Sequence, residues 1–208
     1  MCRLRYNAPM IPYIKNNLAN ILTVSRLLLL PVIILLFFLE EHWGGIAVWL
    51  ALLVYIGAAI TDFLDGYIAR KFNQITPFGT FLDPISDKVF VSTLLILLIA
   101  FDRIDGLWLF LPILIFAREF LISGLREFLG PKDIKVPVTF LAKWKTAIQM
   151  LSLGFLIIGP YAPYALEIGL IFLSVATLLT IITGLSYYVA AKIHLHDENH
   201  IDAGKEKS

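Results

Sequence analysis

Long apolar runs separated by short polar turns dominate the chain and predict an all-α integral membrane protein. A helix that spans a membrane needs about 20 residues, and six segments approach or exceed that length. No alternation of apolar and polar residues typical of strands competes over comparable lengths. The six segments cover residues 20–39, 45–72, 84–101, 106–128, 141–158 and 165–193. We therefore expect a six-helix transmembrane domain over residues 20–193.

The two ends of the chain differ from this domain. Residues 1–19 contain two prolines and no continuous apolar run typical of a signal peptide, so we expect an amphipathic juxtamembrane arm on the cytoplasmic surface. Residues 194–208 are polar and predict a cytoplasmic tail. A metal site at His194, His196 and His200 is the alternative for this tail, but their spacing suits one helix face poorly and favours a solvated tail.

Composition excludes a soluble fold and leaves basic residues to be judged by their position. Hydrophobic residues make up 59% of the chain and charged residues 16%, against about 25% charged residues in soluble domains. The net charge is +1, and no nucleic acid is expected as a partner. Cys2 is the only cysteine, which excludes an intrachain disulfide.

The basic residues predict the orientation in the membrane. With six spans both termini lie on one side, and placing them inside leaves Arg103 as the only one of the 17 basic residues outside. Cytoplasmic segments of membrane proteins carry an excess of Lys and Arg. We therefore expect an N-in, C-in protein of the cytoplasmic (inner) membrane.

Five of the six predicted helices are polar at their cytoplasmic ends. Arg26, Asp62, Asp87, Arg118 and Lys145 each belong to a different one of these helices. Charged groups within membrane helices are costly in lipid and usually face the bundle interior or a water-filled cavity. The pattern predicts a shared polar cavity that opens to the cytoplasm.

Four aspartates at helical spacing form the most distinctive polar group. Asp62 and Asp65 are three residues apart on the second predicted helix, and Asp83 and Asp87 are four apart on the third. Four converging carboxylates would repel one another unless cations bind between them, and Mg²⁺ and Mn²⁺ prefer carboxylate oxygens. We expect one or two such ions. The alternative for Asp83 is a helix N-cap followed by Pro84 at the first helical position.

The residues between these acids suit a phosphate ligand. Gly66 and Ala69 leave room on the helix surface, and Arg70 provides a planar fork for phosphate oxygens. Gly79, in the predicted loop before the third helix, permits a similar close approach. Carboxylate-bound magnesium commonly also binds substrate phosphates. The stretch therefore predicts a metal and diphosphate site, although Gly66 and Ala69 alone are also typical of helix packing.

The stretch from Asp62 to Asp87 resembles the signature of the CDP-alcohol phosphotransferases, membrane enzymes of phospholipid synthesis. It matches D-x-x-D-G-x-x-A-R-(x8)-G-x-x-x-D-x-x-x-D at every specified position. The resemblance implies a six-helix fold, usually homodimeric, with Asp87 as the base on the acceptor hydroxyl. It further implies a site of two metal ions on Asp62, Asp65, Asp83 and Asp87, and a nucleotide-diphosphate pocket lined by Asp62, Gly66, Ala69, Arg70 and Gly79.

Basic residues on the fourth and fifth predicted helices point to an acceptor that carries its own phosphate. Arg118, Arg126, Lys143 and Lys145 lie toward the same membrane face as the aspartates. Two alternatives are open for these residues: a general excess of basic residues on the inner side, or a structural ion pair between the Arg and Glu residues of these helices. Arg118 fits the general excess poorly, because apolar stretches lie on both sides of it.

Three further stretches resemble one subfamily, the bacterial phosphatidylglycerophosphate synthases. They are "NILTVSRLLLLP", "REFLISGLRE" and "KWKTAIQM", although Ala19 stands where the subfamily commonly has proline. The resemblance implies transfer of the phosphatidyl group from CDP-diacylglycerol to glycerol 3-phosphate. It implies that the acceptor phosphate binds Arg118, Lys143 and Lys145, with Arg126 and Gln149 as further candidates, and that Asn20 and Thr23 contact the cytidine.

Two other functions fit parts of the pattern. A cardiolipin synthase of the same superfamily would use phosphatidylglycerol as the acceptor. A divalent-cation transporter would also need acids within the membrane, but those acids are expected near the midplane rather than at one face.

Overall fold

The structure is a computed structural model that describes the backbone of residues 18–72, 77–129 and 140–205. Within these helices the side chains of residues 18–24, 62–72, 77–81, 83, 129, 140, 142 and 190–205 are not described.

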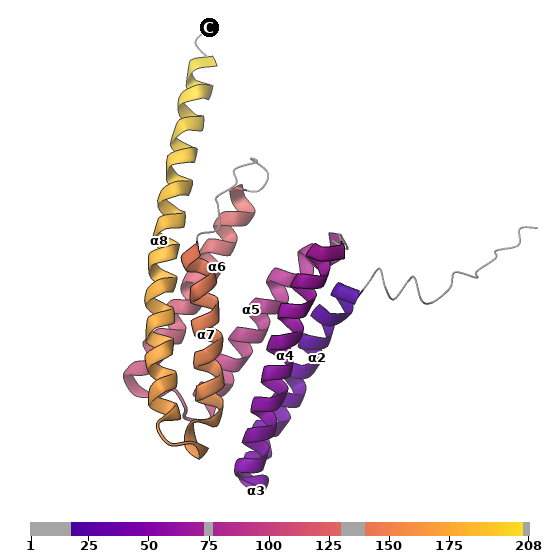
Figure 1. Cartoon of the computed structure of the whole chain (residues 1–208). Coiled ribbons are helices and arrows are strands. Elements are labelled where there is room, and N and C mark those ends of the chain that lie inside the picture. The colour runs from indigo at the N-terminus through magenta and orange to yellow at the C-terminus, as the bar shows by residue number, and fades with distance from the viewer. Residues whose placement is uncertain (1–17, 73–76, 130–139, 206–208) are drawn as a thin grey trace, which may run out of the picture. The chain divides into compact units, whose positions relative to one another are not determined.

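Every regular element in the described ranges is a helix, which confirms the all-α prediction. Three short elements occupy turns: α3 (Glu40–Trp43), η1 (Gly106–Leu109) and η3 (Gly159–Tyr161). The six long helices correspond to the six predicted segments (Figure 1) and are α2 (Leu18–Phe38), α4 (Gly45–Phe72), α5 (Pro77–Ala100), α6 (Phe110–Leu129), α7 (Phe140–Ile158) and α8 (Ala165–Lys205).

Two helix boundaries differ from the prediction. Helix α5 already begins at Pro77, so Pro84 lies inside it and Gly79 belongs to its first turn rather than to a loop. The interpretation of Asp83 as the N-cap of this helix is therefore wrong. Helix α8 continues to Lys205, although the apolar pattern ended at Ile193, because its last turns contain polar residues that are compatible with a helix.

The chain divides into two units, and the first comprises residues 1–97. Helices α2 and α4 lie side by side in it (Figure 1). The α4 residues Ala47, Ala51 and Ala58 are fully buried, and small side chains at this spacing let two helices approach closely. The rings of Tyr55 on α4 and Phe90 on α5 stack with centroids 6.0 Å apart, which joins these two helices.

The second unit comprises residues 98–208, in which α8 packs against both α6 and α7. Leu153 and Leu156 of α7 and Leu173 of α8 are fully buried. The hydroxyl of Ser152 on α7 donates a hydrogen bond of 2.8 Å to the carbonyl of Gly169 on α8. A hydroxyl thus reaches the backbone of the next helix only because the two helices approach closely at Gly169.

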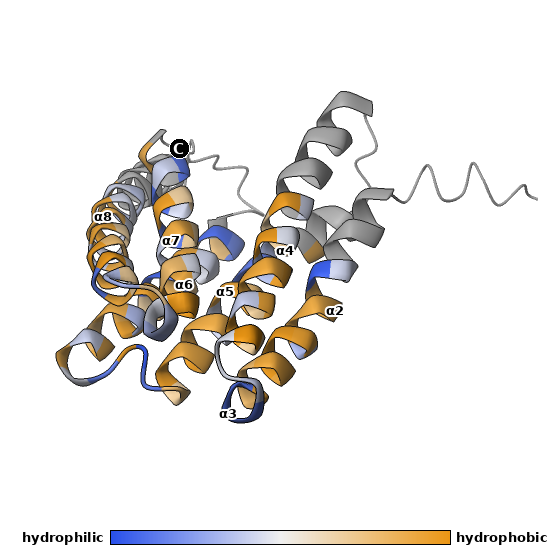
Figure 2. Ribbon diagram, turned by 60° about the horizontal axis from the view of Figure 1, so that its bottom comes forward, coloured by the Kyte–Doolittle hydropathy of each residue, from blue (hydrophilic) through white to orange (hydrophobic). Residues whose placement is uncertain are grey.

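The distribution of polar side chains is the reverse of that in a water-soluble protein. Arg26, Ser86 and Gln149 are buried, whereas Leu53 and Leu121 are exposed. Figure 2 shows apolar residues recurring along the described helices. An exposed apolar surface of this extent suits a lipid environment. Two described segments are long and apolar enough to cross a membrane, Gly106–Phe128 and Ala165–Val189. We conclude that this is a membrane protein.

Replacement of Gly169 by alanine is expected to loosen the packing of α7 against α8. A Cβ at this position would lie 2.8 Å from two side-chain carbons of Leu156 and 3.1 Å from its backbone nitrogen. Because the backbone nitrogen cannot move away, we expect Gly169→Ala to lower the free energy of unfolding by about 1–3 kcal/mol. The measurement is the melting temperature of the purified protein in detergent.

Gly57→Ala is the matched control, because a Cβ there would have no heavy atom within 4 Å. Alanine favours a helix over glycine by about 0.8–1.0 kcal/mol, so this variant should melt at the same or a higher temperature. Equal melting temperatures for the two variants would contradict the packing argument.

Candidate functional site

Helices α4 and α5 carry all the positions of the aspartate motif at the helical spacing that the sequence predicts. The α4 positions from Asp62 to Arg70 belong to one uninterrupted helix, and Asp87 lies one turn after Asp83 on α5. The convergence of the four carboxylates stays a prediction, because among them only the Asp87 side chain is described. The other motif side chains lie outside the described residues: Asp62, Asp65, Gly66, Ala69, Arg70, Gly79 and Asp83.

Asp87 forms an ion pair with Arg26, which comes from α2. The Arg26 side chain is 3% exposed and that of Asp87 56%, so the cation is buried and the carboxylate reaches the surface of its unit. A buried guanidinium needs such a partner, because leaving it unpaired in an apolar environment is strongly unfavourable. Arg26 thus holds a carboxylate of the predicted metal site.

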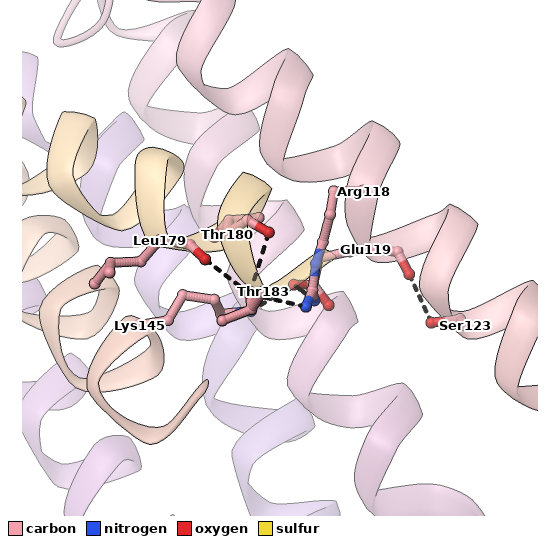
Figure 3. A network of polar contacts seen from close by, with 7 residues as sticks. All are labelled: Arg118, Glu119, Ser123, Lys145, Leu179, Thr180 and Thr183. Carbon is pink, nitrogen blue, oxygen red and sulfur yellow. Dashed lines mark hydrogen bonds and ion pairs between the residues drawn. The ribbon is translucent and has the colours of Figure 1, made fainter. Parts of the chain in front are cut away.

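A second ionic cluster joins α6, α7 and α8 (Figure 3). The Oε1 atom of Glu119 accepts hydrogen bonds from the Arg118 guanidinium at 3.0 Å and from the Lys145 ammonium at 2.5 Å. All three side chains are largely buried, with exposed fractions of 17%, 26% and 11% for Arg118, Glu119 and Lys145. Two cations and one carboxylate leave this cluster with one formal positive charge. The cluster therefore suits binding of an anion.

Helix α8 completes the surroundings of Arg118. The Thr183 hydroxyl accepts a hydrogen bond of 3.2 Å from the Arg118 guanidinium and is itself placed to donate to the carbonyl of Leu179, 2.7 Å away. Within the part of the chain that the structure describes, the buried Nε of Arg118 has no hydrogen-bond partner. A buried donor without an acceptor carries an energetic cost.

Among the described contacts, no hydrogen bond or ion pair joins the other predicted acceptor residues to this cluster. The guanidinium of Arg126 lies over the ring of Tyr187, 5.7 Å from its centroid, and Lys143 is exposed. Gln149 is buried and lies one helical turn beyond Lys145 on α7. The positions of Asn20 and Thr23 lie on α2, but their side chains are outside the described residues.

Sequence reasoning missed the role of three members of these clusters. The sequence pattern predicts Arg26 as one of the inner charges, but nothing in the sequence pairs it with a residue 61 positions later. The expected ion pair of Arg118 with a Glu of these helices does not include Lys145. For Thr183 the only signal is that hydroxyl residues recur at every third position of this stretch, which does not distinguish it from Thr177 or Thr180. The ion pair between Arg118 and Glu119 is present, and the cluster still keeps its excess positive charge.

Oxygen donors make the aspartate motif the candidate metal site of this chain. Among the side chains that the structure describes, no three His, Cys, Asp or Glu residues gather at one point. The four motif aspartates offer only carboxylate oxygens, the ligand type that Mg²⁺ and Mn²⁺ prefer. Their donor chemistry fits such ions.

The motif on α4 and α5 and the all-helical membrane fold define a class of lipid-synthesis enzyme. The chain belongs to the CDP-alcohol phosphatidyltransferase family, whose family model matches residues 16–190. This match reaches all six long helices, although it ends within α8.

Curated relatives of similar length carry one enzyme name, CDP-diacylglycerol–glycerol-3-phosphate 3-phosphatidyltransferase. The relative from Rickettsia prowazekii is 47% identical over 87% of this chain and 98% of its own. The relative from Pseudomonas fluorescens is 42% identical over 86% and 92%. The relative from Escherichia coli K12 is 37% identical over 88% and 98%.

Removal of the Glu119 charge should destabilise the second unit. Glu119→Gln leaves Arg118 and Lys145 close together without their shared carboxylate, and we expect a loss of about 1–3 kcal/mol in the free energy of unfolding. The melting temperature in detergent measures this loss. Glu127→Gln is the control on the same helix, because Glu127 is exposed and should change stability by less than about 0.5 kcal/mol. Equal effects at both positions would contradict the counter-ion role.

Proposed function

We propose that this protein transfers the phosphatidyl group from CDP-diacylglycerol to glycerol 3-phosphate and releases CMP. The observation that carries this proposal is the similarity to relatives of that name over nearly the whole of both chains. Membership of the family supports the reaction class, which is phosphoryl transfer from a CDP-linked lipid. The product is phosphatidylglycerophosphate, a precursor of phosphatidylglycerol and cardiolipin.

The donor site of the proposal is the aspartate motif on α4 and α5. Asp62, Asp65, Asp83 and Asp87 would hold two divalent cations, Mg²⁺ or Mn²⁺. When bound, such ions neutralise charge on the diphosphate and on the leaving CMP. The family resemblance assigns Gly66, Ala69, Arg70 and Gly79 to the diphosphate, and Asn20 and Thr23 to the cytidine.

The acceptor site of the proposal is the cluster around Glu119. Arg118 and Lys145 would bind the phosphate of glycerol 3-phosphate, since a guanidinium and an ammonium both donate charge-assisted hydrogen bonds to phosphate oxygens. The one formal positive charge of the cluster supports this assignment. Lys143, Arg126 and Gln149 would lie farther from the phosphate, in keeping with their positions outside the ionic cluster.

The chemical step needs a proton acceptor, and we assign that role to Asp87. Its carboxylate would take the proton of the free primary hydroxyl of glycerol 3-phosphate. The hydroxyl oxygen then forms a bond to the phosphorus that bears diacylglycerol. The bond between that phosphorus and the bridging oxygen breaks, and the electron pair leaves with CMP. Arg26 would keep the Asp87 side chain in place through their ion pair.

The membrane arrangement of the proposal follows the sequence expectations. It has six spanning helices, both termini in the cytoplasm and the site open to the cytoplasmic face of the inner membrane. Acyl chains of the donor would then stay in lipid while the polar reaction takes place at the membrane surface. The functional unit would be a homodimer, as is usual in the family.

An acceptor comparison tests the proposed function. The purified protein is supplied with CDP-diacylglycerol, a divalent cation and either labelled glycerol 3-phosphate or phosphatidylglycerol. We expect CMP release and a labelled phosphatidylglycerophosphate with the first acceptor and no product with the second. Cardiolipin formed from phosphatidylglycerol, without reaction of glycerol 3-phosphate, would overturn the acceptor assignment.

The assignment of Asp87 predicts a selective loss of chemistry. Asp87→Asn should lower the rate of CMP release by at least about a hundredfold, because a positioned base contributes on that order. Binding of CDP-diacylglycerol, measured with a labelled lipid, should survive in part. Asp105→Asn is the control, since Asp105 is exposed in a turn before η1 and should keep full activity. Full activity of Asp87→Asn would exclude the base role.

A further inference from the structure

Gly184 on α8 lies directly against the side chain of Arg118 on α6. A Cβ at Gly184 would be 3.0 Å from the Cγ and 3.1 Å from the Nε of Arg118. Contacts this short are tighter than ordinary van der Waals contact, so the arginine lies where any larger residue would place its side chain. The absence of a side chain at 184 therefore permits the arginine to take this path across α8.

Thr183, the neighbour of Gly184, holds the far end of the same arginine. Its hydroxyl is buried and accepts the hydrogen bond from the guanidinium. The donor capacity of this hydroxyl is directed to the carbonyls of Leu179 and Thr180, at 2.7 and 3.2 Å. Its lone pairs are thus left for Arg118, and Figure 3 shows the residues in this arrangement.

Arg118 is consequently held on two sides. Glu119 binds its Nη1 on one side, and Thr183 binds its Nη2 on the other. The middle of the side chain rests on Gly184. Since the guanidinium is held by Glu119 and Thr183 and the Cα belongs to helix α6, a methyl group under the middle of the side chain is expected to displace the guanidinium. One turn farther along α8, the ring of Tyr187 lies against the second arginine of α6, Arg126.

We propose that Thr183 and Gly184 are positioning residues, which place the Arg118 guanidinium for the phosphate of the acceptor. This proposal rests on the proposed function, because it takes Arg118 as a ligand of that phosphate. It gives helix α8, to which the sequence assigned no part of the site, a role in acceptor binding. Neither residue needs to touch the acceptor itself.

The first test is Gly184→Ala, assayed with varied glycerol 3-phosphate and saturating CDP-diacylglycerol. A displacement of the guanidinium by a few tenths of an ångström should raise KM for glycerol 3-phosphate about threefold to tenfold. The reason is that misplacing a substrate-positioning group by about 1 Å can lower the efficiency of an enzyme about a hundredfold. The KM for CDP-diacylglycerol should stay unchanged. Gly184→Val should have the larger effect, since its side chain is bulkier.

Gly124→Ala is the matched control, because a Cβ at this α6 position meets no heavy atom within 4 Å. Both substitutions favour the helix over glycine, so a rise in KM confined to Gly184→Ala cannot come from helix propensity. Equal kinetics of the two alanine variants would overturn the role of Gly184.

The second test removes the hydroxyl of Thr183 and keeps the shape of the side chain. Thr183→Val should raise KM for glycerol 3-phosphate about tenfold, because a hydrogen bond to a charged group is lost. Thr183→Ser keeps the hydroxyl and should restore KM. Thr177→Val is the control, since the Thr177 hydroxyl is buried on the same helix and bonds only to the carbonyl of Leu173 among the described contacts.

Arg118→Gln separates the failure of this proposal from that of the acceptor site. If Arg118→Gln raises KM for glycerol 3-phosphate but Gly184→Ala and Thr183→Val do not, the positioning role is wrong and the acceptor site stands. If Arg118→Gln leaves KM unchanged, the assignment of Arg118 itself is wrong. A fall in the melting temperature of Gly184→Ala or Thr183→Val, with KM unchanged, would give these residues a purely structural role and overturn the proposal.

Discussion

Lipid cannot solvate a charged side chain, and this constraint determines the arrangement of the polar groups in this protein. The apolar faces of the helices are turned outward, so charges must find their partners on neighbouring helices. Arg26 on α2 forms an ion pair with Asp87 on α5, and Lys145 on α7 forms one with Glu119 on α6. Each pair ties two helices together within one unit. In the proposed function, the same groups that join the helices also bind the polar substrates.

The two units carry different parts of the proposed reaction. The first unit contains the aspartate motif, whose carboxylates suit divalent cations and a diphosphate. The second contains the cluster around Glu119, whose excess positive charge suits a phosphate monoester. Family membership supports the proposed donor site, since the aspartate motif would bind the CDP-linked donor. In the proposed function, acceptor choice rests on the second unit, where Arg118 and Lys145 are arranged by contacts among α6, α7 and α8.

The existence of the long helices was predictable, because runs of apolar residues have few other ways to satisfy their backbone in lipid. Their ends were less predictable. Pro84 suggested a helix start, yet α5 begins about two turns earlier at Pro77. A proline is compatible with a helix interior when the freed carbonyl finds another partner, which sequence cannot reveal. Likewise α8 continues past Ile193, because polar residues are also compatible with a helix.

The sequence by itself determined the class of protein, the aspartate motif and the presence of basic residues on α6 and α7. These features depend on spacing along one chain, which helix periodicity converts into a common face. Only the tertiary structure decided which carboxylate pairs with which cation. Glu119 and Lys145 are 26 residues apart in the sequence, and Arg26 and Asp87 are 61 residues apart. It also decided that α8 lies against the Arg118 side chain. A glycine and a threonine in an apolar helix show no function until the neighbouring arginine is seen to lie across them.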